Sequence, residues 1–150
     1  MTSTPTSSHK TFRFLGPDMT MHAWGDLTGG ALGLIEQVAP PGFAAPPHVH
    51  HAEDEAFYVV EGNVVFHRGE AAFAAAPGSF VWLPRDVAHG FEVGADGPAR
   101  LLQFNTPAGL EQFFAELGTP PGEPAAGPAP ERLIEAAGRY RIELLGGEPR

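Results

Sequence analysis

The sequence predicts a single all-β domain, a small barrel built from short strands, followed by two short helices. The chain has 150 residues, the length of one domain, and its 43% hydrophobic content is sufficient for a core. Its 19 glycines and 16 prolines interrupt most of the chain every few residues. Short apolar runs separated by such turn residues are typical of a β-sandwich or barrel.

The expected strands are short runs of β-branched, aromatic and other apolar residues: Phe12–Leu15, Met19–Trp24, Leu32–Val38, Phe57–Val60, Val64–His67, Phe80–Leu83, Phe91–Val93 and Leu101–Phe104. A hairpin turn is expected at Gly62, because glycine adopts positive φ between two apolar strands. We therefore assign residues 11–106 to the barrel and expect residues 1–10 to form a flexible N-terminus.

The pattern changes at Pro107. Thr106 can cap a helix with Pro107 at its first position, and Gly118 can end it. The apolar residues between them recur at helical spacing, namely Leu110, Phe113, Phe114 and Leu117. Residues 119–130 hold five prolines and two glycines, which predicts an extended linker. A second helix is expected at about Glu131 to Tyr140, with Leu133, Ile134 and Ala137 on one face, and residues 107–150 thus form a helical extension.

The composition argues against several partners and sites. The 18 acidic and nine basic residues give a net charge of −9, which repels nucleic acid and anionic lipid. Because the chain has no cysteine, disulfides, thiolate metal sites and a cysteine nucleophile are excluded. No apolar run approaches the ~20 residues of a membrane helix, and residues 1–10 do not resemble a secretion signal. We expect a cytoplasmic protein that binds neither nucleic acid nor membranes.

Four residues form a candidate metal site. His48 and His50 lie two apart, so in a strand both side chains project to the same face. Glu55 can return toward them from the next strand, and His89 follows a turn after the run that ends at Leu83. Three imidazoles and one carboxylate suit one divalent transition metal, Fe, Ni, Mn, Co or Zn, without choosing among them.

These residues also carry a family resemblance. The chain resembles the cupin superfamily, whose first motif, G-x5-H-x-H-x3,4-E-x6-G, is filled by Gly42, His48, His50, Glu55 and Gly62. The second motif, G-x5-P-x-G-x2-H-x3-N, is matched by Gly78, Pro84 and His89. Asp86 replaces its usual glycine and Val93 its usual asparagine, and aspartate tolerates turn conformations well.

Residues 105–114 resemble the segment that follows the barrel in single-domain cupins similar to flavonol (quercetin) 2,3-dioxygenases. The resemblance implies a double-stranded β-helix, or jelly-roll barrel, with metal bound by the four residues that match the motifs. It also implies a homodimer.

The strand pattern places further side chains near this site. Phe57 and Val59 share the face of Glu55, and Phe91 shares the face of His89. With Trp82 and Phe104 as further candidates, these residues would line a cavity suited to an aromatic or otherwise apolar ligand. Ordinary core packing is the alternative for all five.

Other polar residues near the motifs receive simpler interpretations. His51 points to the opposite strand face, and Glu53 and Asp54 are expected to be solvated carboxylates of a turn. Arg85 and Arg100 are expected at the surface or in ion pairs.

The first functional hypothesis is a metal-dependent dioxygenase acting on a small aromatic, flavonol-like or enol substrate, with Glu55 as both ligand and base. On an octahedral ion, four protein ligands leave two positions open, which favours a catalytic over a structural metal. The second hypothesis is a non-redox isomerase, lyase or decarboxylase at the same site. The third is a small-ligand-binding module without catalysis.

Overall fold

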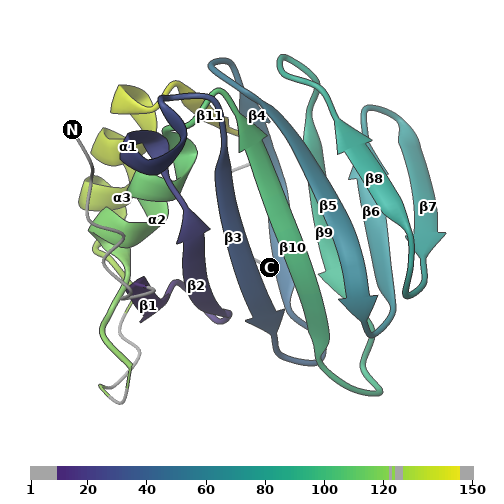
Figure 1. The fold of residues 1–150 in the computed structure, drawn as a ribbon. Helices are drawn as coiled ribbons and strands as arrows, with labels where there is room; N and C mark the ends of the chain where they lie inside the picture. Colours follow the sequence, from purple (N-terminus) through teal and green to yellow (C-terminus); the bar gives the residue numbers. More distant parts are fainter. Residues whose placement is uncertain (1–9, 122, 124–126, 146–150) are drawn as a thin grey trace.

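The computed structural model describes residues 10–121, 123 and 127–145, which form two antiparallel sheets with helices beside them (Figure 1). One sheet has the order β1 (Lys10–Arg13), β2 (Asp18–Ala23), β3 (Gly33–Ala39), β10 (Ala99–Thr106), β5 (Asp54–Glu61) and β8 (Phe80–Leu83). The other has the order β11 (Ile142–Leu144), β4 (Ala44–His50), β9 (His89–Val93), β6 (Val64–Arg68) and β7 (Ala71–Ala75).

The two sheets face each other as a sandwich. Among the described residues, each strand pairs only within its own sheet, so closure of the predicted barrel is not confirmed. The core between the sheets follows the strand alternation, with Phe57 and Val59 of β5 packed against Phe66 of β6 and Phe91 of β9. The all-β prediction itself is confirmed.

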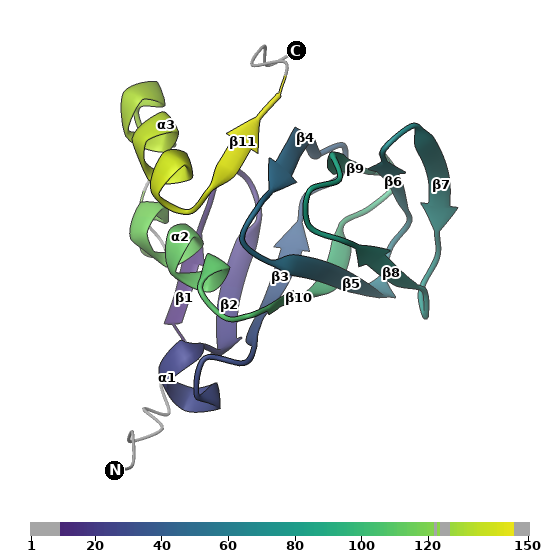
Figure 2. The same cartoon turned by 90° about the horizontal axis from the view of Figure 1, so that it is seen from above.

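The helices cover the part of the larger sheet that the smaller sheet leaves open. Figure 2 shows α2 (Leu110–Leu117) and α3 (Pro130–Arg139) beside β1 and β2, with β11 leading from α3 to β4. A second core lies here, formed by residues such as Phe12, Met21, Ile35, Leu110 and Ile142. The inner face of the six-stranded sheet therefore packs against two cores, one between the sheets and one beneath the helices.

Helix α2 begins later than predicted, at Leu110 instead of Pro107. The residue that precedes it, Gly109, has a φ of 142° and donates its N–H to the buried Glu111 carboxylate at 2.8 Å. In α3, Ala137 of the expected stripe faces the core, as does Ala136, which was not predicted there, but Ile134 is 63% exposed. The prediction of Ile134 on the buried face is therefore wrong.

Several elements were not predicted. Strand β7 consists of alanines and one phenylalanine, and β11 and the single-turn α1 (Gly25–Thr28) are too short to leave a pattern. In β4, Pro46 and Pro47 lie where the pairing with β9 shifts register, which is where a sheet accepts proline.

The expected linker and N-terminus are described only in part. Thr119 exchanges two backbone hydrogen bonds of 2.8 Å with Arg13, so the segment starts in contact with β1. Residues 1–9, 122 and 124–126 lie outside the described residues, so the flexible N-terminus stays a prediction. In the described part of the chain, no helix has the length and apolar character needed to cross a membrane.

Replacing Gly90 with alanine is expected to destabilise the domain by about 1–3 kcal/mol and to weaken metal binding. A Cβ at Gly90 would lie 2.6 Å from the carbonyl oxygen of Ala45, so β4 would have to move away from β9 beside two candidate ligands. Urea unfolding measures the effect. The control is Gly97→Ala, because no atom lies within 4 Å of its new Cβ. Equal stabilities of the two variants would contradict the close contact.

Candidate metal centre

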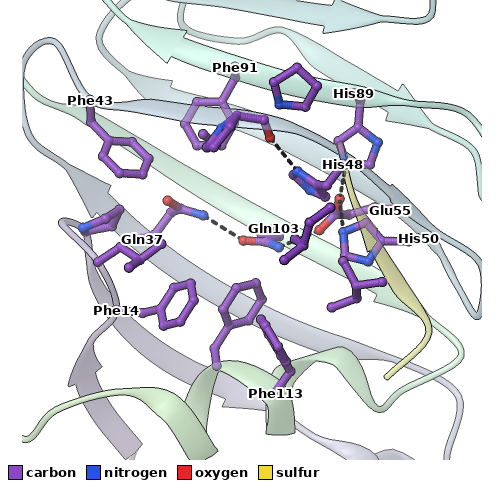
Figure 3. Close-up of a pocket in the computed structure, with 18 of the residues that line it drawn as sticks. Phe14, Gln37, Phe43, His48, His50, Glu55, His89, Phe91, Gln103 and Phe113 are labelled. Carbon is purple, nitrogen blue, oxygen red and sulfur yellow. Dashed lines mark hydrogen bonds and ion pairs between the residues drawn. The ribbon is translucent and has the colours of Figure 1, made fainter. Parts of the chain in front are cut away.

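The four predicted ligands converge at one point between the sheets. His48 and His50 lie on β4, His89 lies opposite His48 on β9, and Glu55 reaches them from β5 in the other sheet (Figure 3). One nitrogen or oxygen atom of each residue lies within 4.8 Å of the others. The alternation of strand side chains thus brings the motif residues together as predicted.

The three imidazoles are oriented by hydrogen bonds on their outer sides. Each Nδ1 lies near an acceptor, which fixes that nitrogen as the donor and leaves Nε2 free to face the centre. The acceptors are the Pro46 carbonyl at 2.8 Å for His48, the Glu53 carboxylate at 3.0 Å for His50 and the Val87 carbonyl at 3.4 Å for His89.

The arrangement fits a divalent metal ion. The Nε2 of His50 is one of two buried side-chain atoms without a hydrogen-bond partner in the described residues, and it lies 3.6 Å from Glu55 Oε1. The same Oε1 lies 2.8 Å from His89 Nε2. An unpartnered buried nitrogen aimed at a carboxylate is costly unless a cation satisfies both. The donor set of imidazoles and carboxylate suits a borderline transition metal.

The electrostatics favour the metal-binding forms of His48 and Glu55, a neutral imidazole and a carboxylate. Burial, followed by the nearby His89 and His50, lowers the pKa of His48 to about 4. Burial acts to raise the pKa of Glu55, but the three imidazoles outweigh it and lower that pKa to about 2. Burial also acts to lower the pKa of His50, whereas Glu55 and Glu53 raise it above its usual value. Glu55 is therefore an anion at neutral pH.

The expectation that Glu53 is a solvated turn carboxylate is wrong. It is only 4% exposed and accepts a hydrogen bond from His50. Two glutamines were also missed: Gln103 donates to Glu55 Oε2 at 2.5 Å, and Gln37 donates to Gln103 at 2.6 Å. A polar residue inside an otherwise apolar strand was the available signal for Gln103.

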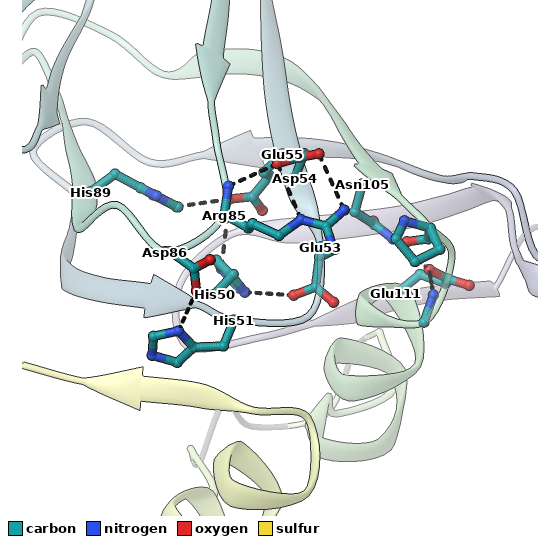
Figure 4. A network of polar contacts seen from close by, with 12 residues as sticks. His50, His51, Glu53, Asp54, Glu55, Arg85, Asp86, His89, Asn105 and Glu111 are labelled. Carbon is teal, nitrogen blue, oxygen red and sulfur yellow. Dashed lines mark hydrogen bonds and ion pairs between the residues drawn. The ribbon is translucent and has the colours of Figure 1, made fainter.

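The polar residues on the outer side of the site form separate ion pairs (Figure 4). As predicted, His51 points away from the cluster, where its Nδ1 lies 2.6 Å from Asp86 and its Nε2 lies 2.9 Å from Glu143 of β11. Arg85 pairs with Asp54, and its side-chain and backbone hydrogen bonds lower the pKa of that carboxyl. Asp86 has a φ of 70°, the conformation that explains glycine at this motif position.

A cavity of about 420 Å³ opens from the cluster toward the helices and β11. Its lining includes the four candidate ligands, Gln37 and Gln103, and otherwise apolar side chains such as those of Phe14, Phe43 and Phe113 (Figure 3). Residues of the C-terminal extension close one side, among them Leu133, Ile142 and Leu144.

Of the five predicted pocket residues, Phe57 and Phe91 line this cavity. Val59 points inward but is fully buried in the core between the sheets. Trp82 is 44% exposed on β8, and Phe104 lies on the face of β10 opposite to Gln103. Val59 thus takes the core-packing role given as the alternative. The placements of Trp82 and Phe104 in the pocket are wrong, because neighbouring strand residues face opposite sides of the sheet.

Glu53→Ala is expected to lower metal affinity by about 10–100-fold, because His50 would lose the acceptor that orients its ring. The measurement is a competition titration with a chromophoric chelator. Asp54→Asn is the matched control, since Asp54 lies next in sequence but contacts Arg85 instead of an imidazole. Glu53→Gln should recover part of the loss through its amide oxygen. Identical affinities for the alanine variant and the control would show that Glu53 does not orient His50.

The comparisons with known proteins point to the cupin domain. Residues 35–105 match the family model of the cupin domain. A solved cupin from Shewanella frigidimarina, described as RmlC-like, is 18% identical to this chain. The structural alignment covers 71% of this chain and 91% of the Shewanella chain, with a TM-score of 0.61. The match over residues 35–105 and the shared fold support membership of the cupin superfamily. No curated protein sequence matches it.

Two further solved structures of similar fold are described as enzymes of different kinds. Streptomyces PAC13, described as a nucleoside dehydratase, has 19% identity, covers 75% of this chain and 88% of its own, and has a TM-score of 0.60. A sugar phosphate isomerase from Silicibacter pomeroyi has 26% identity, covers 61% of this chain and 59% of its own, and has a TM-score of 0.52.

Proposed function

We propose that this cupin is a metal-dependent enzyme of the dioxygenase type, acting on a small aromatic, flavonol-like or enol substrate. The observation that carries the proposal is a cluster of three imidazoles and one carboxylate at a cavity that is otherwise apolar apart from Gln37 and Gln103. The described lining contains no lysine or arginine, so no basic side chain would pair with a phosphate group.

In this proposal, His48, His50, Glu55 and His89 would hold one Fe, Ni, Mn, Co or Zn ion. A bound ion of this kind supplies Lewis acidity and, when it is redox-active, reactivity toward O₂. Glu55 is the base for the substrate's hydroxyl proton, and Gln103 orients its carboxylate through a hydrogen bond to Oε2. A weak base suffices, since a nearby cation makes the hydroxyl more acidic. The aromatic walls exclude water and hold the ring system of the substrate.

A non-redox isomerase, lyase or decarboxylase is the second candidate, because a dehydratase and an isomerase share this fold. The apolar lining argues against a sugar phosphate as its substrate. A ligand-binding module without catalysis is the third. We also propose a homodimer located in the cytoplasm, without nucleic acid or membrane partners.

The test measures O₂ consumption by protein loaded separately with each candidate metal, using a panel of flavonols and enediols. The dioxygenase proposal expects metal-dependent O₂ uptake that is lost in Glu55→Gln. Turnover of the panel under strictly anaerobic conditions would favour the lyase or isomerase. Baseline O₂ uptake with every fully loaded metal would contradict the dioxygenase, and binding without turnover would favour the third candidate.

A further inference from the structure

Glu55, Gln103 and Gln37 form a diagonal row across three neighbouring strands. On β10, Gln103 lies opposite Phe57 of β5 and opposite Ile35 of β3, and Glu55 and Gln37 each lie two residues along from those partners. All three side chains face the interior. Diagonal neighbours in a sheet lie within reach of long side chains, so the register itself brings the two amides and the carboxylate into contact.

The hydrogen bonds in this row run in one direction. Gln37 donates from Nε2 to Gln103 Oε1, and Gln103 donates from its own Nε2 to Glu55 Oε2. Because a carboxylate only accepts, its partner must present an amide nitrogen, and the bond from Gln37 holds Gln103 in that orientation. Both glutamines are buried, which strengthens these bonds relative to solvent-exposed ones.

The two oxygens of Glu55 therefore have different surroundings. Oε1 lies 2.8 Å from His89 Nε2 and 3.6 Å from His50 Nε2, whereas Oε2 is taken by Gln103. We propose that Gln103, held by Gln37, is a positioning residue that restricts Glu55 to coordinating a metal through Oε1 alone. This inference rests on the proposed metal site.

This restriction would matter for the chemistry of the site. A carboxylate can bind a cation through one oxygen or chelate it through both. On a six-coordinate ion, three imidazoles and one carboxylate oxygen leave about two positions open, whereas a chelating carboxylate leaves about one. Gln103 thus preserves the second open position, which a substrate with two oxygen donors, or a substrate together with O₂, needs.

The test compares wild type with Gln103→Met and Gln37→Met, each loaded with Mn²⁺. Methionine matches glutamine in length but cannot donate a hydrogen bond. Water-proton relaxivity per bound Mn²⁺ reports the number of exchangeable waters, and the visible spectrum of the Co²⁺-loaded protein reports coordination geometry. Leu101→Met is the matched control, because Leu101 is an inward-facing apolar residue on the same strand, two positions from Gln103.

We expect Gln103→Met to lower the relaxivity by about half, from about two waters to about one, and to change the Co²⁺ spectrum. Gln37→Met should shift both signals in the same direction by less, and it remains informative if Gln103→Met does not fold. Signals equal to wild type in both glutamine variants would overturn the inference, as would the same shift in the control. Wild type that binds neither Mn²⁺ nor Co²⁺ would overturn the metal site and this inference together, which distinguishes the two failures.

Discussion

Replacing His89 with alanine is expected to lower the affinity for a divalent transition metal by more than about 100-fold, beyond the loss typical of an outer-shell residue. His89 is buried, and its Nε2 contacts Glu55 Oε1 on one side while its ring packs edge-on against His48 at a centroid distance of 4.6 Å. Without His89, the metal would keep only the three ligands on β4 and β5. Isothermal titration with Zn²⁺ or Co²⁺ measures the change.

His67→Ala is the control for this variant. His67 lies on β6 with an exposed side chain paired to Glu92 at 3.0 Å, outside the cluster. A metal concentration about 100-fold above the wild-type Kd should stabilise wild type and His67→Ala by about 2.7 kcal/mol, and His89→Ala by less than about 0.4 kcal/mol. Equal stabilisation of all three proteins would show that the bound metal lies elsewhere.

Glu111→Ala is expected to destabilise the fold by about 3 kcal/mol or more. The fully buried carboxylate accepts hydrogen bonds from Asn105 Nδ2 at 3.0 Å, from the Gly109 N–H at 2.8 Å and from the Gly25 N–H at 3.0 Å. Removing it would leave these donors buried without partners where α1, β10 and α2 meet. Urea unfolding followed by circular dichroism measures the loss.

Glu111→Gln should be affected less, because its amide oxygen still accepts from part of this set. Glu135→Ala is the control, since Glu135 is an exposed residue of α3 paired with Arg139, and its midpoint should stay close to wild type. A Glu111→Ala midpoint equal to that of Glu135→Ala would contradict the structural role of the buried carboxylate.

The metal ligands could be predicted from sequence because their arrangement follows local rules. His48 and His50 lie two residues apart, so they share a face of their strand. The same two-residue period places Glu55 and Phe57 together on one face of β5. The run Phe80–Leu83 contained no such marker. With four apolar residues in sequence, either face could be buried, and the structure buries Val81 and Leu83 while exposing Trp82.

The residues around the ligands depended on strand pairing that the sequence does not display. Gln103 and Gln37 meet Glu55 only through the register of β3, β10 and β5. Strand β11 pairs with β4 through Ile142 opposite His50, and three residues are too few to predict a strand. One side of the cavity is therefore formed by β11, a strand in the segment that the sequence analysis assigned only to a helical extension.

Elemental analysis of untagged protein tests the central claim most directly, because all proposed chemistry depends on a metal held by the four clustered side chains. We predict about one divalent transition-metal ion per chain in wild type after reconstitution and dialysis, and almost none in the His48→Ala/His50→Ala double variant. Wild type that stays free of transition metal after reconstitution, or a double variant that retains as much metal as wild type, would contradict the account.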